Sequence, residues 1–423
     1  MNGNPPRPLT ADAFLREETY AATRLPVSLA STLIPDAYTS PEFFELEQQR
    51  VFRTSWVAVA GGSQLAGPGD TLVTEVGGQS LILVRTAQGA LRAFHNVCRH
   101  RGARLLDPGP CHLKRIIKCP YHSWAYDLDG NCLGTPLFDD DSHVPSDQRG
   151  IFDMTDVDRF DKSDHGLHQA AVAEWGPLVF VNLDPHAAPL AEQLGDLPER
   201  LSGYRMDEWR VARSRTYEIA ANYKLIGENF MEYYHLPWVH PGLVKVSPMK
   251  AHHRWQGAGM YTGMCTSPIA SNSDQGGWLD LPPISRLSEN DAVSARFAWV
   301  FPSTALNVLP NHLFIMLAHP VDAAHTREET LLLVHQDLAE GPDVEAGIDG
   351  LASFWDTVNR EDIEIVERVQ KGLGSLAYSG GRMCYRFEEP LHRFQNMVID
   401  RMLGIRRVPE GDELYESEMF PQA

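Results

Sequence analysis

The spacing of hydrophobic and polar residues predicts a helix near the N-terminus, followed by a series of short strands. Ser40-Pro41 predicts the helix start, because serine caps a helix well and proline fits the first turn, and the apolar face continues to about Phe52. Beyond this helix the hydrophobic period changes to two. The runs on either side of Gly77-Gly78 and of Asp129-Gly130 are typical of hairpins. The pattern therefore predicts a small β-domain.

A second, larger domain is predicted after an acidic stretch. Residues 139–164 are acidic and rich in turn-forming residues, so we interpret them as a linker or a long surface loop. The apolar run 178–183 predicts the first buried strand of the second domain. Residues 359–372 predict an amphipathic helix with Gly372 as its C-terminal cap. We expect an α+β protein with an N-terminal arm and helix at 1–54, an all-β domain at 55–165 and a larger domain at 166–423.

Composition and charge exclude several classes of protein. The chain has 423 residues, which is enough for two domains with substantial cores. No apolar run reaches the roughly 18 residues of a membrane-spanning helix, so we expect no membrane partner. The formal charge of −19 argues against a nucleic-acid partner, because phosphate binding requires a basic surface. Six cysteines without a pairing pattern and the lack of a secretory signal favour the cytoplasm.

Two short Cys/His motifs carry the first chemical signal. Cys98 and His100 are separated by 18 residues from Cys119 and His122. Two thiolates and two imidazoles suit a two-iron cluster whose irons have different ligands, as in a Rieske [2Fe–2S] centre. Zinc modules usually pair two cysteines with two histidines at other spacings. A structural zinc site is the alternative.

A second signal predicts a site for a single metal ion. His235 and His240 lie five residues apart where a helix-like stretch ends near Pro237, so both imidazoles can reach one ion. A carboxylate would complete the facial triad that is typical of mononuclear Fe(II) oxygenases, in which positions stay open for O2. Asp362, on the predicted amphipathic helix, is the candidate. Two neighbouring carboxylates compete with it, Glu361 and Glu364.

From about Phe44 to Leu373 the sequence resembles the catalytic α subunit of the Rieske non-haem iron oxygenases. The resemblance rests on the stretch around each metal motif, although Ser123 stands where glycine is more usual. It implies a Rieske domain and a catalytic domain whose antiparallel sheet is flanked by helices in a helix-grip, START-like fold. It also implies two sets of ligands: Cys98, His100, Cys119 and His122 for the cluster, and His235, His240 and Asp362 for the iron.

The same resemblance implies a route for electrons between chains. The family's bridging carboxylate falls on Glu232, where it would connect His122 of one chain to His235 of another in a homotrimer. Asn229, three residues earlier, is a further candidate catalytic residue. The chain has no dinucleotide or flavin motif, so NAD(P)H electrons are expected to come through a separate flavin- or ferredoxin-type reductase.

Three functions remain open at this point. The sequence is similar to the branch that oxidises quaternary ammonium compounds such as choline, glycine betaine, proline betaine and carnitine, which predicts hydroxylation or N-demethylation of a methylated amine. Aromatic side chains bind such cations, and the candidates are Tyr234, Trp238, Trp255, Tyr261, Trp278, Phe297 and Trp299. The alternatives are an oxygenase of aromatic rings and, from another class, an electron carrier that uses the cluster alone.

Overall fold

The chain forms two compact units in the computed structural model, which describes residues 9–138, 146–148, 160–269, 281–338 and 340–410. The larger unit comprises Met1–Ala58, Trp175–Pro177 and Ala188–Ala423, and the smaller unit comprises Val59–Glu174 and Leu178–Ala187. Within the described residues, no helix is long and apolar enough to cross a membrane.

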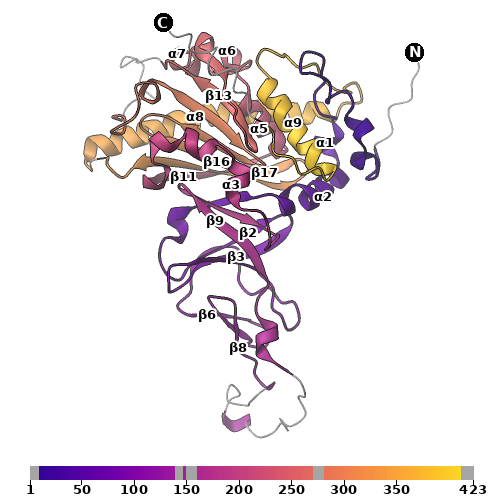
Figure 1. Ribbon diagram of the computed structural model, residues 1–423, viewed down its shortest axis with the longest axis vertical. Coiled ribbons are helices and arrows are strands. Elements are labelled where there is room, and N and C mark those ends of the chain that lie inside the picture. Colours follow the sequence, from indigo (N-terminus) through magenta and orange to yellow (C-terminus); the bar gives the residue numbers. More distant parts are fainter. Residues whose placement is uncertain (1–8, 139–145, 149–159, 270–280, 339, 411–423) are drawn as a thin grey trace. The chain divides into compact units, whose positions relative to one another are not determined.

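The smaller unit is built on a seven-stranded sheet in the order β1-β10-β9-β4-β3-β2-β5. Strands β2, β3 and β9 of this sheet are labelled in Figure 1. The predicted hairpin at Gly77-Gly78 is confirmed, because β2 and β3 pair in antiparallel register on either side of it. Both glycines have positive φ angles, 59° and 69°, as a two-residue hairpin turn of this kind requires. The strands are β1 Val57–Gly61, β2 Asp70–Val76, β3 Gln79–Arg85, β4 Leu91–His95, β5 Gly109–His112, β9 Gln169–Trp175 and β10 Leu178–Asn182.

A three-stranded sheet in the smaller unit confirms the second hairpin. Its strands are β6 Ile116–Lys118, β7 Ala125–Asp127 and β8 Cys132–Gly134. The turn needs Gly130, whose φ is 86° and whose hydrogen faces Phe94, so an added Cβ would lie 2.4 Å from that ring. The Asp127 carboxylate accepts the backbone N–H groups of Asp129 and Asn131 and so fixes the turn.

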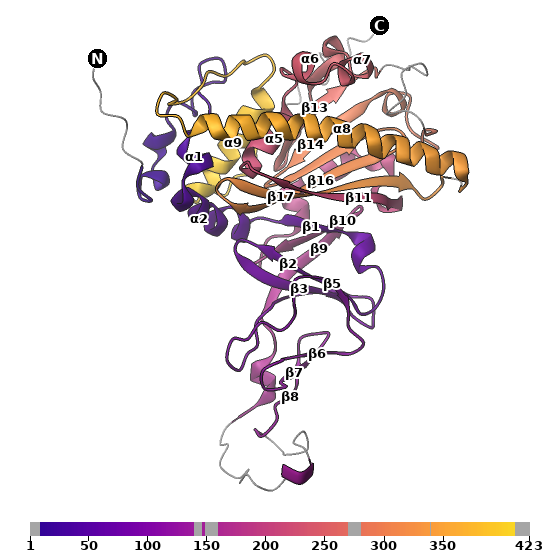
Figure 2. The same cartoon turned by 180° about the vertical axis from the view of Figure 1, so that it is seen from behind.

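The larger unit confirms the predicted antiparallel sheet flanked by helices. Its seven strands follow the order β11-β17-β16-β15-β14-β13-β12, and every neighbouring pair is antiparallel. Figure 2 shows the long helix α8, Pro342–Leu373, running across this sheet. Helix α5, Tyr223–Met231, contacts α8, α9 and strands β13 to β16. The strands are β11 Trp209–Ile219, β12 His252–Arg254, β13 Tyr261–Thr266, β14 Ala295–Val300, β15 Thr304–Val308, β16 Leu313–Asp322 and β17 His325–His335.

The N-terminal helix packs into the larger unit through a buried ion pair. Helix α2, Pro41–Arg50, begins where predicted, with the Ser40 hydroxyl accepting the N–H of Phe43, and it ends two residues before the expected limit. The Lys224 ammonium on α5 donates to both carboxylate oxygens of Glu47, at 3.0 and 2.9 Å, and neither side chain is exposed. The remaining helices are α1 Asp36–Thr39, α3 Leu190–Leu194, α4 Leu197–Arg200, α6 Leu236–Val239, α7 Leu243–Val246 and α9 Glu389–Met402.

The division of the chain differs from the predicted domains at two boundaries. The apolar run at 178–183 was expected to open the larger domain at residue 166, but β9 and β10 complete the sheet of the smaller unit. Its continuous apolar character predicted a buried strand correctly, while strand pairing is a long-range property that a local pattern does not specify. The N-terminal residues belong to the larger unit instead of forming a separate arm. Most of the acidic stretch 139–164 lies outside the described residues.

Candidate active site and metal centres

Two short helical segments place the histidines of the second motif. The prediction that one helix continues to Pro237 is wrong: α5 ends at Met231, and Pro237 lies in the first turn of the separate helix α6. Proline is favoured in a first turn, where its missing N–H would have no partner inside the helix. His235 directly precedes α6 and His240 directly follows it, so the short helix sets the spacing of the two imidazoles.

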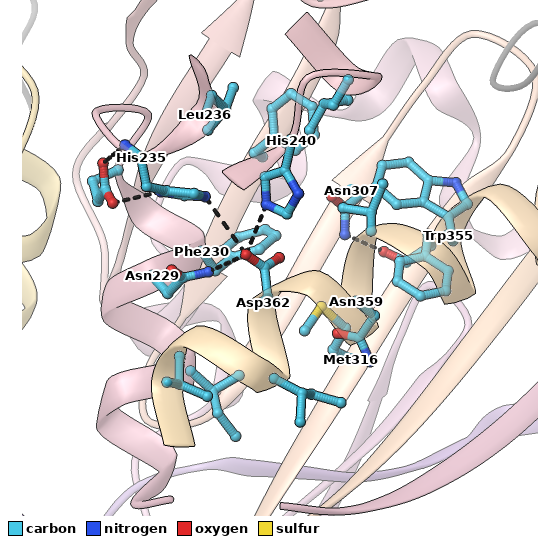
Figure 3. Close-up of a pocket in the computed structure, with 18 of the residues that line it drawn as sticks. Asn229, Phe230, His235, Leu236, His240, Asn307, Met316, Trp355, Asn359 and Asp362 are labelled. Carbon is cyan, nitrogen blue, oxygen red and sulfur yellow. Dashed lines mark hydrogen bonds and ion pairs between the residues drawn. The ribbon is translucent and has the colours of Figure 1, made fainter. Parts of the chain in front are cut away.

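The carboxylate of the triad comes from the middle of α8. This helix starts earlier than the predicted segment and ends at Leu373, so that Gly374 is its C-terminal cap in place of the predicted Gly372. Asp362 lies three residues after the buried Asn359 and four before the buried Val366, which places all three on one face of the helix. The predicted helix is therefore confirmed, and Asp362 points from its inner face toward the histidines (Figure 3).

The three side chains bring their donor atoms together. His240 Nε2 lies 2.8 Å from Asp362 Oδ1, and His235 Nε2 lies 3.6 Å from the same oxygen (Figure 3). The donor atoms of all three residues lie within 4.8 Å of one another. Asn229 Nδ2 also donates to Asp362 Oδ1, at 2.6 Å, and so orients the carboxylate from α5. Two imidazoles and one carboxylate are the donor set of a facial Fe(II) triad, so these residues fit a mononuclear iron.

Two glutamates fix the orientation of the imidazoles. His235 Nδ1 faces Glu232 Oε1 at 2.5 Å, and His240 Nδ1 faces Glu361 Oε2 at 2.7 Å. A carboxylate that accepts the Nδ1–H of a metal-binding histidine leaves Nε2 free for the metal and raises its basicity. Glu361 therefore supports His240 instead of competing with Asp362. The other competitor, Glu364, is exposed and pairs with Arg368.

A cavity beside these residues is mostly apolar and aromatic. The volume of the cavity is about 60 Å³. Of the aromatic residues predicted to bind a substrate, Phe297 lines the cavity and Trp278 lies outside the described residues. Tyr234, Trp238, Trp255, Tyr261 and Trp299 are not among the lining residues. The sequence prediction missed three aromatic residues that do line it, namely Phe230, Phe314 and Trp355.

The first motif gathers in the smaller unit. Cys98 and Cys119 are buried, and the rings of His100 and His122 lie 4.7 Å apart between centroids. The Tyr126 hydroxyl lies 3.4 Å from Cys98 Sγ. Burial above all raises the pKa of the Cys98 thiol, so a bound metal is needed to hold it as a thiolate.

The surroundings of His100 fit a cluster ligand. Its Nδ1 is buried and has no hydrogen-bond partner within the described part of the chain, while its ring stacks on Trp124 at 5.0 Å. A buried imidazole nitrogen without a partner is costly unless a metal occupies it. Ser123 has a φ of 61°, which explains in physical terms why a glycine would suit this position better.

A further group of possible ligands is already neutralised. Glu208, His335 and Asp337 bring donor atoms within 4.8 Å of one another. However, Arg205 forms ion pairs with Glu208 at 2.7 Å and with Asp337 at 3.0 Å. The guanidinium already supplies the positive charge that a metal ion would bring, so we interpret this group as an ion-pair cluster.

Comparison with known proteins identifies both units. Residues 206–404 match the family described as ring hydroxylating alpha subunit (catalytic domain), and residues 55–146 match the Rieske [2Fe-2S] domain. The chain is 32% identical over 353 residues to the carnitine monooxygenase oxygenase subunit of Acinetobacter pittii, which covers 81% of this chain and 85% of that protein. It is 28% identical over 400 residues to the glycine betaine monooxygenase oxygenase subunit of Chromohalobacter salexigens, covering 87% and 85%.

Solved structures show the same architecture. The quaternary ammonium Rieske monooxygenase CntA in complex with L-carnitine is 29% identical, covers 92% of this chain and 99% of its own, and gives a TM-score of 0.71. Naphthalene 1,2-dioxygenase from a Rhodococcus species gives the same TM-score of 0.71 at 20% identity, covering 93% of this chain and all of its own. At that identity the second likeness concerns the fold alone.

Proposed function

Because this chain belongs to the Rieske non-haem iron oxygenases, we propose that it uses O2 to hydroxylate or oxidatively N-demethylate a small quaternary ammonium compound or another methylated amine. The observation that carries the proposal is an aromatic cavity that opens directly onto the His235, His240 and Asp362 triad. The names of the carnitine and glycine betaine relatives support the substrate class.

Two cofactors belong to this family, a Rieske [2Fe–2S] cluster and a mononuclear iron. We assign the cluster to two cysteines and two histidines, Cys98, His100, Cys119 and His122, and the iron to His235, His240 and Asp362. When bound, the cluster supplies electrons one at a time and the iron supplies a site for O2 activation. Asn229 holds the Asp362 carboxylate in position from α5.

The side chains that line the cavity can bind the substrate and exclude water from it. The faces of Phe230, Phe297 and Trp355 can hold a methylated ammonium group by cation–π attraction, at about 0.5–2 kcal/mol per contact. Apolar walls also keep water away from the reacting carbon. Hydroxylation of a methyl group on nitrogen gives a carbinolamine, which breaks its C–N bond and releases formaldehyde and the demethylated amine. Hydroxylation at another carbon leaves the amine intact.

Electrons reach the protein from outside in this proposal. A separate reductase that oxidises NAD(P)H passes them to the cluster. We assign Glu232 as the bridge between His122 of one chain and His235 of another in a homotrimer. The short contact from Glu232 to His235 Nδ1 within the chain supports half of this bridge. A homologous structure, that of a quaternary ammonium Rieske monooxygenase, is described as revealing inter-subunit electron transfer.

Two other functions make different predictions. An oxygenase of aromatic rings would insert both oxygen atoms and form cis-diols, and the apolar cavity alone would accommodate such a ring. A pure electron carrier would reduce and reoxidise its cluster without consuming O2 in response to any substrate. The convergence of His235, His240 and Asp362 has no role in a carrier.

A reductase-coupled screen separates these functions. The holoenzyme is supplied with NADH, a Rieske-type reductase and one candidate substrate at a time, and O2 uptake, formaldehyde and hydroxylated products are measured. Choline, glycine betaine and carnitine represent the methylated amines, while naphthalene and benzoate represent the rings. We expect substrate-dependent O2 uptake with a methylated amine. Diols from a ring with no product from any amine would refute the proposal.

A further inference from the structure

A buried carboxylate in the cavity has half of its hydrogen-bonding capacity unused. Glu328 lies on β17 and is not exposed to solvent. Its Oε1 accepts from Asn359 Nδ2 on α8 at 2.7 Å, whereas its Oε2 is buried and has no hydrogen-bond partner among the described residues. Glu328 lines the same cavity as the metal triad. One oxygen is therefore oriented by α8, and the other is a buried acceptor with no hydrogen-bond partner among the described residues.

An unpaired carboxylate in such surroundings is costly. Transfer of an ionised group to an apolar interior is strongly unfavourable unless a cation compensates for it. Burial raises the pKa of Glu328 to about 7, which reflects this penalty. A cation beside Oε2 would restore the ionised form, because an opposite charge at close range favours it.

No described residue that lines the cavity supplies that cation. None of the described residues that line the cavity is lysine or arginine. The described lining residues therefore leave the positive charge to the metal or to the substrate.

The charges around the cavity indicate which net charge the substrate carries. Three carboxylates line the cavity, those of Glu232, Glu328 and Asp362. Burial lowers the pKa of His252, another lining residue, to about 4, so this imidazole is neutral near pH 7. A bound Fe(II) would neutralise two of these three negative charges, and Glu361, which contacts His240 without lining the cavity, adds a further carboxylate beside the metal. A positively charged substrate would therefore reduce the remaining excess of negative charge.

We infer that the cavity selects a methylated ammonium cation that has no carboxylate of its own, a choline-like substrate, with Glu328 as its counter-charge. The inference rests on the proposed function and narrows its substrate class. A zwitterionic betaine carries a carboxylate that would also have to be buried, and the cavity offers it no lysine or arginine. The unpaired Oε2 of Glu328 would repel that carboxylate if the two lay close together.

Binding to the iron-loaded enzyme tests the selectivity directly. Equilibrium dialysis with radiolabelled choline, glycine betaine and carnitine gives three dissociation constants at one pH and ionic strength. We expect choline to bind at least about tenfold more tightly than either betaine, since a buried charge left without its partner costs that much or more. The neutral carbon analogue of choline, 3,3-dimethyl-1-butanol, should bind more weakly than choline for the same reason.

Glu328→Gln tests the residue itself. The amide keeps an oxygen to accept from Asn359 but removes the charge, so choline affinity should fall at least about tenfold while the affinity for the neutral analogue stays the same or rises. The matched control is Glu228→Gln. Glu228 is also buried and has a pKa of about 7, but it does not line the cavity, so its replacement should leave choline affinity unchanged.

The outcomes of these experiments distinguish a failure of the inference from a failure of the proposed function. Tighter binding of carnitine or glycine betaine than of choline would overturn the inference and leave the proposed function in place. Equal loss of choline and neutral-analogue affinity in Glu328→Gln would overturn it as well. If no ammonium compound binds or stimulates O2 uptake while an aromatic ring does both, the proposed function fails, and the inference fails with it.

Discussion

At the scale of single residues, the site is defined by which nitrogen of each histidine is free. Glu232 and Glu361 occupy the Nδ1 atoms of His235 and His240, so both Nε2 atoms face Asp362. Glu232 and Glu361 thus orient the two imidazoles, whereas Asp362 shares the candidate metal site with them. Replacing a carboxylate that only orients a ligand should weaken metal binding without abolishing it.

Glu361→Gln should lower the affinity of the larger unit for iron by roughly 10–100-fold, the usual effect of losing such a partner. The measurement is iron content after dialysis against a series of chelator concentrations. Glu364→Gln is the control, because Glu364 lies on the same helix, is exposed and pairs with Arg368. Equal iron retention in the two variants would contradict the role of Glu361.

Glu228 makes stability depend on pH. Burial raises its pKa from 4.5 to about 7, so the folded state takes up a proton more readily than the unfolded state. Its contribution to stability is therefore complete below about pH 4.5 and is lost as the pH rises through 7. Glu228→Gln keeps an acceptor for Tyr38 and Gln395 but carries no charge. It should raise the free energy of unfolding at pH 8 by about 1–3 kcal/mol and have little effect at pH 4.5, as measured by urea denaturation. A larger gain at the acidic pH would contradict the assignment.

Candidate ligands are easier to predict from the sequence than the residues that support them. The spacing of Cys98, His100, Cys119 and His122 is itself the chemical signal, because few other sites need that combination. Glu328 has no such signal. It stands next to Glu329 in a polar stretch, and only the alternation of a strand, which buries Thr326, Glu328 and Thr330, separates the two glutamates. The sequence shows this alternation, but it does not show which face of the strand points into the protein.

At the scale of elements, α5 depends on a close approach to the sheet. Gly227 lies in the middle of α5, and a Cβ at this position would lie 2.6 Å from the buried ring of Trp299 on β14. Glycine normally weakens a helix interior, so its presence here has a packing reason. Helix α5 in turn carries Asn229, which orients Asp362.

Gly227→Ala should therefore destabilise the larger unit and reduce its iron content, even though alanine favours helices. We expect a loss of roughly 1–3 kcal/mol, the usual effect of overpacking a core. Gly372→Ala is the matched control. It lies in α8 with nothing within 4 Å of the added methyl group, so it should stabilise by about 0.5–1 kcal/mol. Thermal unfolding followed by circular dichroism distinguishes the two, and a stabilising Gly227→Ala would refute the packing argument.

Local patterns predicted elements well and their partners poorly. The turns at Gly77-Gly78 and Asp129-Gly130 were predictable because backbone conformation decides them within a few residues. The break between α5 and α6 was not, because Pro237 was assigned to the end of one helix when it begins another. Likewise, the run that forms β10 is predicted correctly as a strand, but it belongs to the smaller unit and not to the larger domain. Turn chemistry is local, whereas sheet membership depends on residues far apart in the chain.

At the scale of the whole molecule, the two candidate metal sites belong to separate compact units. The residues that we assign to the cluster lie in the smaller unit, and those that we assign to the iron lie in the larger one. Damage to one site should therefore leave the other intact. In the proposed trimer, a chain with a working cluster could then serve the iron of its neighbour.

Mixed trimers provide the test. His122→Ala and His235→Ala should each be inactive alone, the first through its cluster and the second through its iron. Co-expressed with different tags and purified through both, they should recover O2 uptake coupled to substrate. The control mixes His235→Ala with Asp362→Ala, which share the same defect and should stay inactive. Failure of the first mixture, with electron paramagnetic resonance showing an intact cluster in His235→Ala, would argue against electron transfer between chains.

The buried pair of Glu47 and Lys224 has a consequence for synthesis of the protein. The two residues are separated by 177 positions, and the whole smaller unit lies between them in the chain. A ribosome therefore completes every residue of the smaller unit before it makes the cation that Glu47 requires. Since domains generally fold as units during synthesis, the smaller unit can fold first, while Glu47 on the N-terminal helix stays hydrated until Lys224 has been made. The first residues made are thus among the last to reach their final place.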